Sequence, residues 1–578
     1  MKKYLLRIIQ KFYRYEQLIV LMLLVIIAFL YYRDIFSFWF VSDDAAAMVS
    51  STETLRKIFF DHIFSHYFYT PLVALSFKPD VMIFGINPFP FHIHNTIILI
   101  LISFMVYTIL REYTDTISSV VPALIVLLSL PSLICLLWIT LRQYLYGMLF
   151  ALFSIFLFLK YQPDIKKNRP VLIIILIFTE LSFMGKEQFM TLPFVLFMLA
   201  KGGFKERLYK TLPYFLLFAG HFILRFRVLR GLGGYLGVQY DPIVYMKTTY
   251  ESIFTASKVL FGYPWVVLLA GAPLLLKLRS LFLSISIWVT SLMVSFLVMH
   301  QYPQVDTYRY WLIPAVLFSF WVGFNSNAIK SIFLKISYSS LILALFLMHS
   351  LALGNEIKGI AGKEMLMAER TTRALFDQKY REAIILFPES NWMASSNFIE
   401  HISTAYQKIH GIKAYSPFYP LELLSFYPKI LNDFRDIYEI KEGEGLNISD
   451  SIHGKIEHFN KSVSDEKPHI SLLKQNNIVN MNLKCASAQG ITGFEVKNVE
   501  GRPTAIKYIA PYIESVNLTN AFDVKDAEVL PRGSLSYDKG KWLIDGMPLS
   551  ENYSFLILTC VNNKGAYTQL SDIISFRH

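Results

Sequence analysis

Long apolar runs separated by short polar connections dominate the first 353 residues. A helix needs roughly 20 apolar residues to cross a bilayer. The pattern therefore predicts about eleven membrane spans, near residues 17–32, 92–110, 117–139, 144–160, 171–185, 188–200, 211–226, 259–276, 281–299, 310–324 and 331–353.

Two of the predicted connections are long, at about residues 33–91 and 227–258. They contain apolar stretches too short to cross a membrane, such as Leu55–Phe64, which are typical of helices lying in the membrane interface. We find no tandem or inverted internal repeat, so the repeat pattern of many transporters is missing.

After Gly354 the chain changes to mixed polar and apolar residues. Ala394–His410 has helical periodicity, with Gly411 as its stop, and Ala383–Pro388 is typical of a buried strand. From about residue 472 short apolar runs such as Ser554–Val561 predominate. The sequence predicts an α-helical polytopic membrane domain at 1–353, an extracytoplasmic α/β segment at 354–470 and a β-rich segment at 471–578.

Composition agrees with a membrane protein. The 578 residues are 54% hydrophobic and only 17% charged, which is too apolar for a soluble globular chain of this size. The net charge is +12, but the positive residues are concentrated in short connections, at 160–169, 201–210, 277–279 and Lys330. This placement argues against a nucleic-acid partner. The positive-inside rule then predicts a plasma-membrane protein with a cytoplasmic N-terminus and an extracytoplasmic C-terminal domain.

An acidic pair, Asp43-Asp44, follows the first predicted span. Adjacent carboxylates raise one another's pKa and can make one of them a general base. The competing explanation is a solvated loop or a helix N-cap, because Ala45-Ala46-Ala47 follows.

Three short outer connections each hold a basic residue, namely Arg142, Lys186 and Arg309. Cations are disfavoured there by the positive-inside rule, so the three predict an anion such as a phosphate held near the outer leaflet. Snorkelling toward lipid head groups is the alternative. Glu187 beside Lys186, and Asp306 near Arg309, also allow simple local ion pairs.

Other candidate sites have weaker support. His62, His66, His92 and His94 have spacings that can bind metal, although histidine at a membrane interface needs no metal to explain it. The glycine-rich stretch 230–237 lacks the dinucleotide pattern, and we expect a flexible loop there. Cys485 and Cys560 either pair or remain free thiols.

The order of several short motifs resembles the GT-C superfamily of membrane glycosyltransferases, which use polyprenyl-phosphate-linked sugars. The resemblance covers roughly residues 15–350. Its landmarks are Asp43-Asp44, Tyr69-Thr70-Pro71-Leu72, Phe84-Gly85-Ile86-Asn87-Pro88, Phe91-His92-Ile93-His94-Asn95, Gly185-Lys186-Glu187-Gln188 with Leu192-Pro193, and Tyr308-Arg309-Tyr310. Protein O-mannosyltransferases and the aminoarabinose transferase that modifies lipid A are members of this superfamily.

The resemblance implies a hexosyl- or pentosyltransferase that works with inversion on the outer side of the membrane. The acceptor would be a glycan, lipid or protein. Asp43 or Asp44 would be the general base, and Lys186, Arg309 and Arg142 would bind the donor phosphate. Glu187, His92 and Tyr310 would support them. No metal is obligatory, but relatives that transfer oligosaccharides use a divalent ion, so Mg²⁺ or Mn²⁺ near Asp43 stays open.

Two other classes of function compete with this hypothesis. A secondary transporter or flippase for a lipid-linked or small polar substrate would carry charges within its spans, and few are present. A non-enzymatic receptor or scaffold would leave Asp43 and Arg309 dispensable.

Overall fold

The computed structural model describes residues 2–41, 43–61, 69–162, 169–229 and 305–380, and beyond 380 the helices and strands given below with short connections. The predicted spans 259–276 and 281–299, the glycine-rich stretch 230–237 and Cys485 lie outside the described residues. The chain divides into two compact units. Unit 1 is Met1–Phe38 with Ser50–Gly362, and unit 2 is Trp39–Val49 with Lys363–His578.

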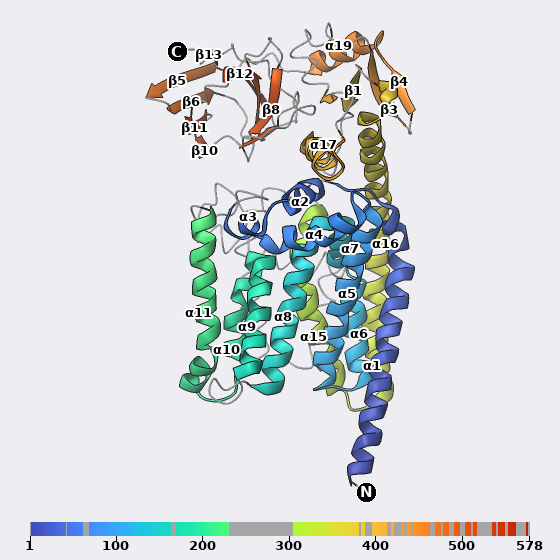
Figure 1. Ribbon diagram of the computed structural model, residues 1–578. Coiled ribbons are helices and arrows are strands. Elements are labelled where there is room, and N and C mark those ends of the chain that lie inside the picture. Colours follow the sequence, from blue (N-terminus) through green and yellow to red (C-terminus); the bar gives the residue numbers. More distant parts are fainter. Residues whose placement is uncertain are drawn as a thin grey trace. The chain divides into compact units, whose positions relative to one another are not determined.

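Apolar helices build unit 1 (Figure 1). They are α1 (Lys2–Tyr32), η1 (Arg33–Ser37), α3 (Leu55–Phe60), α4 (Pro71–Phe84), α5 (Pro88–Arg111), α6 (Thr116–Leu127), α7 (Leu130–Leu137), η2 (Ile139–Leu141), α8 (Arg142–Tyr161), α9 (Arg169–Gly185), η3 (Glu187–Thr191), α10 (Leu192–Leu199), α11 (Phe204–Leu229), η4 (Val305–Trp311), α15 (Leu312–Ala328) and α16 (Ile332–Leu375), which continues into unit 2.

Among the described residues, the structure is mostly helical where the spans were predicted, but the predicted span 188–200 divides into η3 and α10. Five described helices are long and apolar enough to cross a membrane, namely α1, α5, α8 with η2, α11 and α16. The chain is therefore a multi-pass membrane protein. The last span also differs in length from the prediction, because α16 continues beyond residue 353 to Leu375.

The predicted span 117–139 is not one straight helix. Its residues form α6 and α7, which are bent by 44° relative to each other. The side chain of Ser129 accepts a hydrogen bond from the backbone N of Ser132 (3.3 Å), so it caps a new helix, and Pro131 occupies the first turn. Hydropathy does not reveal this break, because the capping residue is one short serine within a mostly apolar run.

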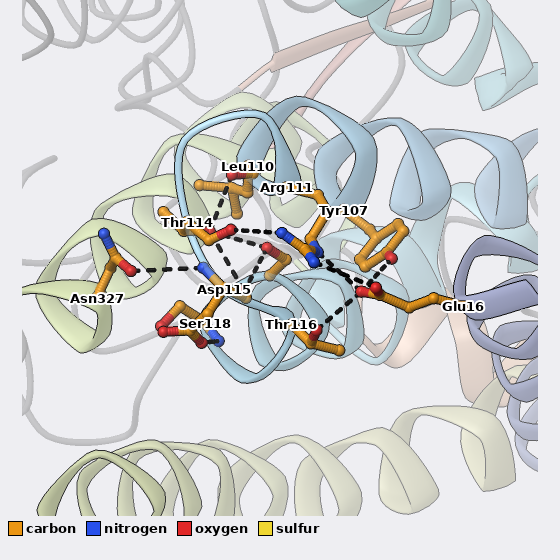
Figure 2. A network of polar contacts seen from close by, with 10 residues as sticks. Glu16, Tyr107, Leu110, Arg111, Thr114, Asp115, Thr116, Ser118 and Asn327 are labelled. Carbon is orange, nitrogen blue, oxygen red and sulfur yellow. Dashed lines mark hydrogen bonds and ion pairs between the residues drawn. The ribbon is translucent and has the colours of Figure 1, made fainter. Parts of the chain in front are cut away.

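One end of unit 1 is tied together by a carboxylate with several donors (Figure 2). Glu16 of α1 accepts hydrogen bonds from Arg111 Nε (2.8 Å) and from the Tyr107 hydroxyl (2.9 Å), both on α5. It also accepts one from the Thr116 hydroxyl (2.8 Å) at the start of α6. These contacts fix α1 against two neighbouring helices.

At the other end, two glycines allow α8 and α9 to approach closely. A Cβ atom at Gly185 would lie 2.8 Å from the Gln143 carbonyl oxygen and 2.8 Å from Gly147 Cα. No larger residue fits there, as is common where membrane helices pack backbone to backbone. The close approach carries the residue after α9, Lys186, to the first turns of α8.

Unit 2 contains most of α2 (Asp44–Ser51) and the chain after α16. A four-stranded sheet has the order β2-β1-β3-β4, in which β1 is parallel to β2 and β3. Its elements, with neighbouring helices, are η5 (Gln378–Tyr380), β1 (Ile384–Phe387), α17 (Ser396–His410), β2 (Phe418–Pro420), β3 (Ile437–Lys441), β4 (Glu444–Asn447) and α19 (Ile452–Ser462). Gly411 has a φ of +69°, which favours glycine directly after α17.

Strands alone make up the described part of the chain after residue 468. They form two antiparallel sheets, with the orders β10-β11-β6-β5 and β13-β12-β7-β8-β9. The strands are β5 (His469–Gln475), β6 (Ile478–Lys484), β7 (Gly490–Lys497), β8 (Pro503–Ile509), β9 (Ile513–Val516), β10 (Ser534–Asp538), β11 (Lys541–Pro548), β12 (Tyr553–Val561) and β13 (Ile574–Ser575).

Candidate functional site

Lys186 and Arg309 lie at the same end of unit 1, where two tyrosine rings connect them. Lys186 Nζ is 5.8 Å from the centre of the Tyr144 ring, which is on α8. The Tyr144 ring meets the Tyr310 ring edge-on at 5.9 Å between centres. Arg309 Cζ is 5.0 Å from the Tyr310 ring centre. Two cations that are 123 positions apart in sequence, from 186 to 309, thus share one aromatic wall.

Both cations are buried. Lys186 is 6% exposed and Arg309 is 7% exposed. Arg309 lies over the Trp138 ring at 4.7 Å and donates from Nη2 to the Tyr310 hydroxyl (3.1 Å). Aromatic faces attract cations, and this attraction is strongest where water is excluded. The arrangement holds positive charge in a largely dry part of the protein.

A carboxylate joins Lys186 to a further cation. Glu187 Oε2 is 3.4 Å from Lys186 Nζ, and Glu187 Oε1 is 3.4 Å from Arg225 Nη2. Arg225 comes from α11 and is 7% exposed. One turn earlier on α11, His221 Nδ1 is 2.8 Å from Glu180 Oε1 of α9. Polar groups from η3, α9 and α11 therefore gather beside Lys186.

Arg142 has a different environment. It is fully buried, and its Nη1 donates to Asp80 Oδ2 (2.7 Å) while its Nε donates to Asn95 Oδ1 (2.9 Å). Its guanidinium lies 4.4 Å from the centre of the Phe77 ring. It also donates to the backbone carbonyl of Ser76 (3.1 Å). These contacts join α4, α5 and α8. The counter-ion of Arg142 is Asp80. A role of Arg142 in phosphate binding stays a prediction.

Asp80 is also held by a second partner. His94 Nδ1 is 2.8 Å from Asp80 Oδ2, and the other ring nitrogen of His94 is 2.7 Å from the Tyr146 hydroxyl. Burial alone would raise the pKa of Asp80, but the hydrogen bond with His94 and the charge of Arg142 hold that pKa below its ordinary value. Asp80 is ionised at neutral pH and keeps α4 in place.

His92, predicted as a supporting residue, lies in the core, and its predicted role stays a prediction. It is fully buried on α5, with Nδ1 2.9 Å from the Leu136 carbonyl oxygen and Nε2 3.2 Å from the Phe38 carbonyl oxygen. These contacts tie α5 to α7 and to the end of η1. The geometry gives His92 a structural role.

The two acidic residues after the first span are not equivalent. Asp44 begins α2, is fully buried, and accepts a hydrogen bond from the Val41 backbone N (3.0 Å) through Oδ2. Asp43 precedes the helix and is exposed. A base must reach a proton on its substrate, so Asp43 is the better candidate of the two.

No group of three or more histidine, cysteine, aspartate or glutamate side chains suitable for a metal is present among the described residues. His62 and His66 lie outside them. His94 pairs with Asp80 and Tyr146 instead.

Sequence reasoning named Tyr310 as a supporting residue but missed Tyr144, Trp138 and the role of Arg225. Tyr144 and Trp138 have no distinguishing spacing in an aromatic-rich membrane protein. Arg225 had a signal, because it is a cation at the end of the predicted span 211–226. In the structure Glu187 is its counter-ion.

Neither protein-family models nor curated proteins gave a match to this chain. The solved structures similar to it include the following two. One is the Archaeoglobus fulgidus oligosaccharyltransferase in complex with Zn and sulfate, with 10% identity, a TM-score of 0.42, and coverage of 96% of this chain and 100% of that chain. The other is ArnT from Cupriavidus metallidurans in the apo state, with 9% identity, a TM-score of 0.42, and coverage of 79% and 96%. Both are GT-C glycosyltransferases. Because both TM-scores are below 0.5, we base the function proposed below on the residues of this chain.

Proposed function

We propose that this chain is a membrane glycosyltransferase that moves a sugar from a polyprenyl-phosphate-linked donor to an acceptor on the outer side of the membrane. The observation that carries this proposal is the pair of buried cations, Lys186 and Arg309, on the shared wall of Tyr144 and Tyr310. Buried cations are retained in membrane proteins mainly where they bind or move something charged.

The charge change during the reaction fits such a site. In the donor, the phosphate is a diester with one negative charge, and the departing polyprenyl phosphate carries up to two. Negative charge therefore grows on the phosphate as the glycosidic bond breaks. Preorganised cations such as Lys186 and Arg309 stabilise that growing charge more than they stabilise the bound donor, and so they accelerate the reaction.

The proposed step is a single displacement. The acceptor hydroxyl oxygen, or amine nitrogen, forms a bond to the anomeric carbon. The bond from that carbon to the phosphate oxygen breaks, and its electron pair leaves with the polyprenyl phosphate. The base that takes the proton of the acceptor is the one that the sequence predicts, Asp43. Attack opposite to the leaving group inverts the anomeric centre.

A divalent ion is not needed for this balance of charges. Asp44 already accepts a hydrogen bond from Val41, and the described residues contain no cluster of three metal-ligating side chains. We assign no step to a divalent ion, and Mg²⁺ or Mn²⁺ near Asp43 stays open. Adding EDTA and then Mg²⁺ or Mn²⁺ to the assay below tests the predicted ion directly.

The test is sugar transfer in proteoliposomes with a panel of radiolabelled polyprenyl-phosphate sugars and membrane-extract acceptors. We expect wild type to consume a donor, and Lys186→Gln and Arg309→Gln to reduce kcat by about 10²–10³, as for other losses of preorganised electrostatic stabilisation. Asp43→Asn should lose transfer because it removes the base.

Lys57→Gln is a matched control, because Lys57 is an exposed cation that pairs with Glu53, four positions earlier in the chain. It should retain wild-type turnover. If wild type consumes no donor, or if Lys186→Gln and Arg309→Gln stay fully active, the glycosyltransferase proposal is wrong. Transport or scaffolding would then become the better hypothesis.

A further inference from the structure

Two buried glutamine amides close to Lys186 have polar atoms without partners. Gln188, in η3, is 5% exposed, and neither its Nε2 nor its Oε1 has a hydrogen-bond partner in the described part of the chain. Gln143, in the first turn of α8, is 8% exposed, and its Oε1 has no such partner either. Buried amides without hydrogen bonds cost free energy, and folded proteins keep few of them.

Both amides belong to the same part of unit 1 as the proposed phosphate site. Gln143 directly precedes Tyr144, whose ring centre is 5.8 Å from Lys186 Nζ. Gln188 follows Lys186 by two positions. A Cβ atom at Gly185 would lie 2.8 Å from the Gln143 carbonyl oxygen, so the chain entering η3 touches the first turn of α8. The two glutamines thus lie on neighbouring segments.

The chemistry of the unpaired glutamine atoms indicates which part of the sugar-donor lipid they contact. Oε1 of Gln143 and Oε1 of Gln188 are acceptors, and each needs a donor. A phosphate diester has only acceptor oxygens, whereas sugar hydroxyls both donate and accept. A planar amide can accept from one hydroxyl and donate to its neighbour on the ring.

We propose that Gln188, together with Gln143, hydrogen-bonds the hydroxyl groups of the donor sugar and so selects the sugar. This inference rests on the proposed function, because it assigns the glutamines to the same donor. Lys186 and Arg309 hold the phosphate, and the amides bind the ring beside it. A donor that presents two neighbouring hydroxyls satisfies Gln188, and a donor that lacks one leaves a buried polar atom unpaired.

The test compares the affinities of the full chain, in nanodiscs, for two ligands. Each affinity is obtained from the shift of the unfolding midpoint temperature as the ligand is titrated. The ligands are polyprenyl phosphate and the polyprenyl-phosphate sugar that wild type consumes. We expect wild type to bind the sugar-bearing lipid more tightly. Gln188→Met should keep the affinity for polyprenyl phosphate and lose about tenfold of the added affinity from the sugar. Lys186→Gln should weaken both ligands.

A third ligand, a deoxy donor that lacks one of the neighbouring hydroxyls, allows a thermodynamic cycle in which the protein and the ligand are each changed at one position. Wild type should lose about tenfold in affinity for it, while Gln188→Met should lose nothing further. In the ligand-free protein, Gln188→Met should unfold at the same or a higher temperature, because it removes an orphan amide.

The matched control is Gln162→Met. The Gln162 amide is satisfied, since Oε1 accepts from the Lys201 backbone N (3.0 Å) and Nε2 donates to the Leu199 carbonyl (3.5 Å). This variant should unfold at a lower temperature and bind both ligands like wild type.

Two results would overturn the inference. If Gln188→Met still binds the sugar-bearing lipid more tightly than polyprenyl phosphate by the wild-type factor, the Gln188 amide does not bind the sugar hydroxyls, while the proposed function stands. If wild type binds neither ligand, the proposed function falls and the inference falls with it.

Discussion

Asp80→Asn is expected to destabilise the protein strongly, because it removes the counter-ion of a fully buried guanidinium. Arg142 Nη1 is 2.7 Å from Asp80 Oδ2, and the two side chains are 0% and 9% exposed. At roughly 4 Å between charge centres and an effective dielectric constant of about 20, their attraction is about 4 kcal/mol. Breaking a buried pair typically costs about 3–5 kcal/mol.

Other contacts of Arg142 reduce this cost. Asn95 and the Ser76 carbonyl still accept hydrogen bonds from the guanidinium, and the Phe77 ring still covers it. We therefore expect about 3 kcal/mol for Asp80→Asn, at the lower end of the range. Arg142→Met should cost a similar amount, because it leaves the Asp80 carboxylate without its cation.

The assay is a double-mutant cycle on reversible unfolding in mixed micelles. Because each single variant already breaks the pair, the double variant should cost less than the sum of the two, with a coupling energy of about 2–3 kcal/mol. The pair Glu53–Lys57, 3.1 Å apart, with an exposed lysine and a half-buried glutamate, is the control and should give about 0.5 kcal/mol. Additive single variants, or a cost below about 1 kcal/mol for Asp80→Asn, would refute the structural role of Arg142 and return it to the proposed phosphate site.

Three further predictions concern stability. Unfolding free energy should fall as the pH drops below about 4, because the folded-state pKa of Asp80 is lower than its unfolded-state pKa. The resulting stabilisation is complete above the unfolded-state pKa and is lost as the pH falls through the folded-state pKa. Acid titration should show this part of the decrease in wild type but not in Asp80→Asn. Glu16→Ala should cost about 1–2 kcal/mol in the same unfolding assay because it removes the acceptor of several partly buried donors. A cost near zero would contradict the network of Figure 2. Gly185→Ala should destabilise the protein by about 1–3 kcal/mol, because the new Cβ atom overlaps with the Gln143 carbonyl oxygen. The control, Gly220→Ala, should be neutral or stabilising, because no atom lies within 4 Å of its Cβ position. Equal effects of the two substitutions would argue against the close approach of α8 and α9.

The class of protein and the positions of its helices follow from the sequence because they depend on local properties. A run of apolar residues has to form a helix in lipid, since no water is present to satisfy the backbone. The predicted spans at 92–110, 144–160 and 171–185 therefore coincide with α5, α8 and α9. The residue types at Lys186 and Arg309 were equally visible, because charges at the ends of apolar runs are conspicuous.

The break between α6 and α7 is where local reasoning failed. Apolar residues predominate through 117–139, with only short polar residues and prolines among them, but Ser129 caps a second helix and Pro131 lies in its first turn. A short polar residue in such a run is compatible with a continuous span or with a new helix. Only packing against neighbouring helices decides between the two.

The sequence by itself determined a multi-pass helical membrane protein with acidic and basic candidates at the span ends. The tertiary structure alone decided their partners. Arg142 forms an ion pair with Asp80, which is 62 positions away in sequence. Lys186 and Arg309 contact the neighbouring rings of Tyr144 and Tyr310. The physical reason is that hydropathy fixes where a helix lies along the membrane normal but leaves its neighbours and its rotation about its own axis to side-chain packing.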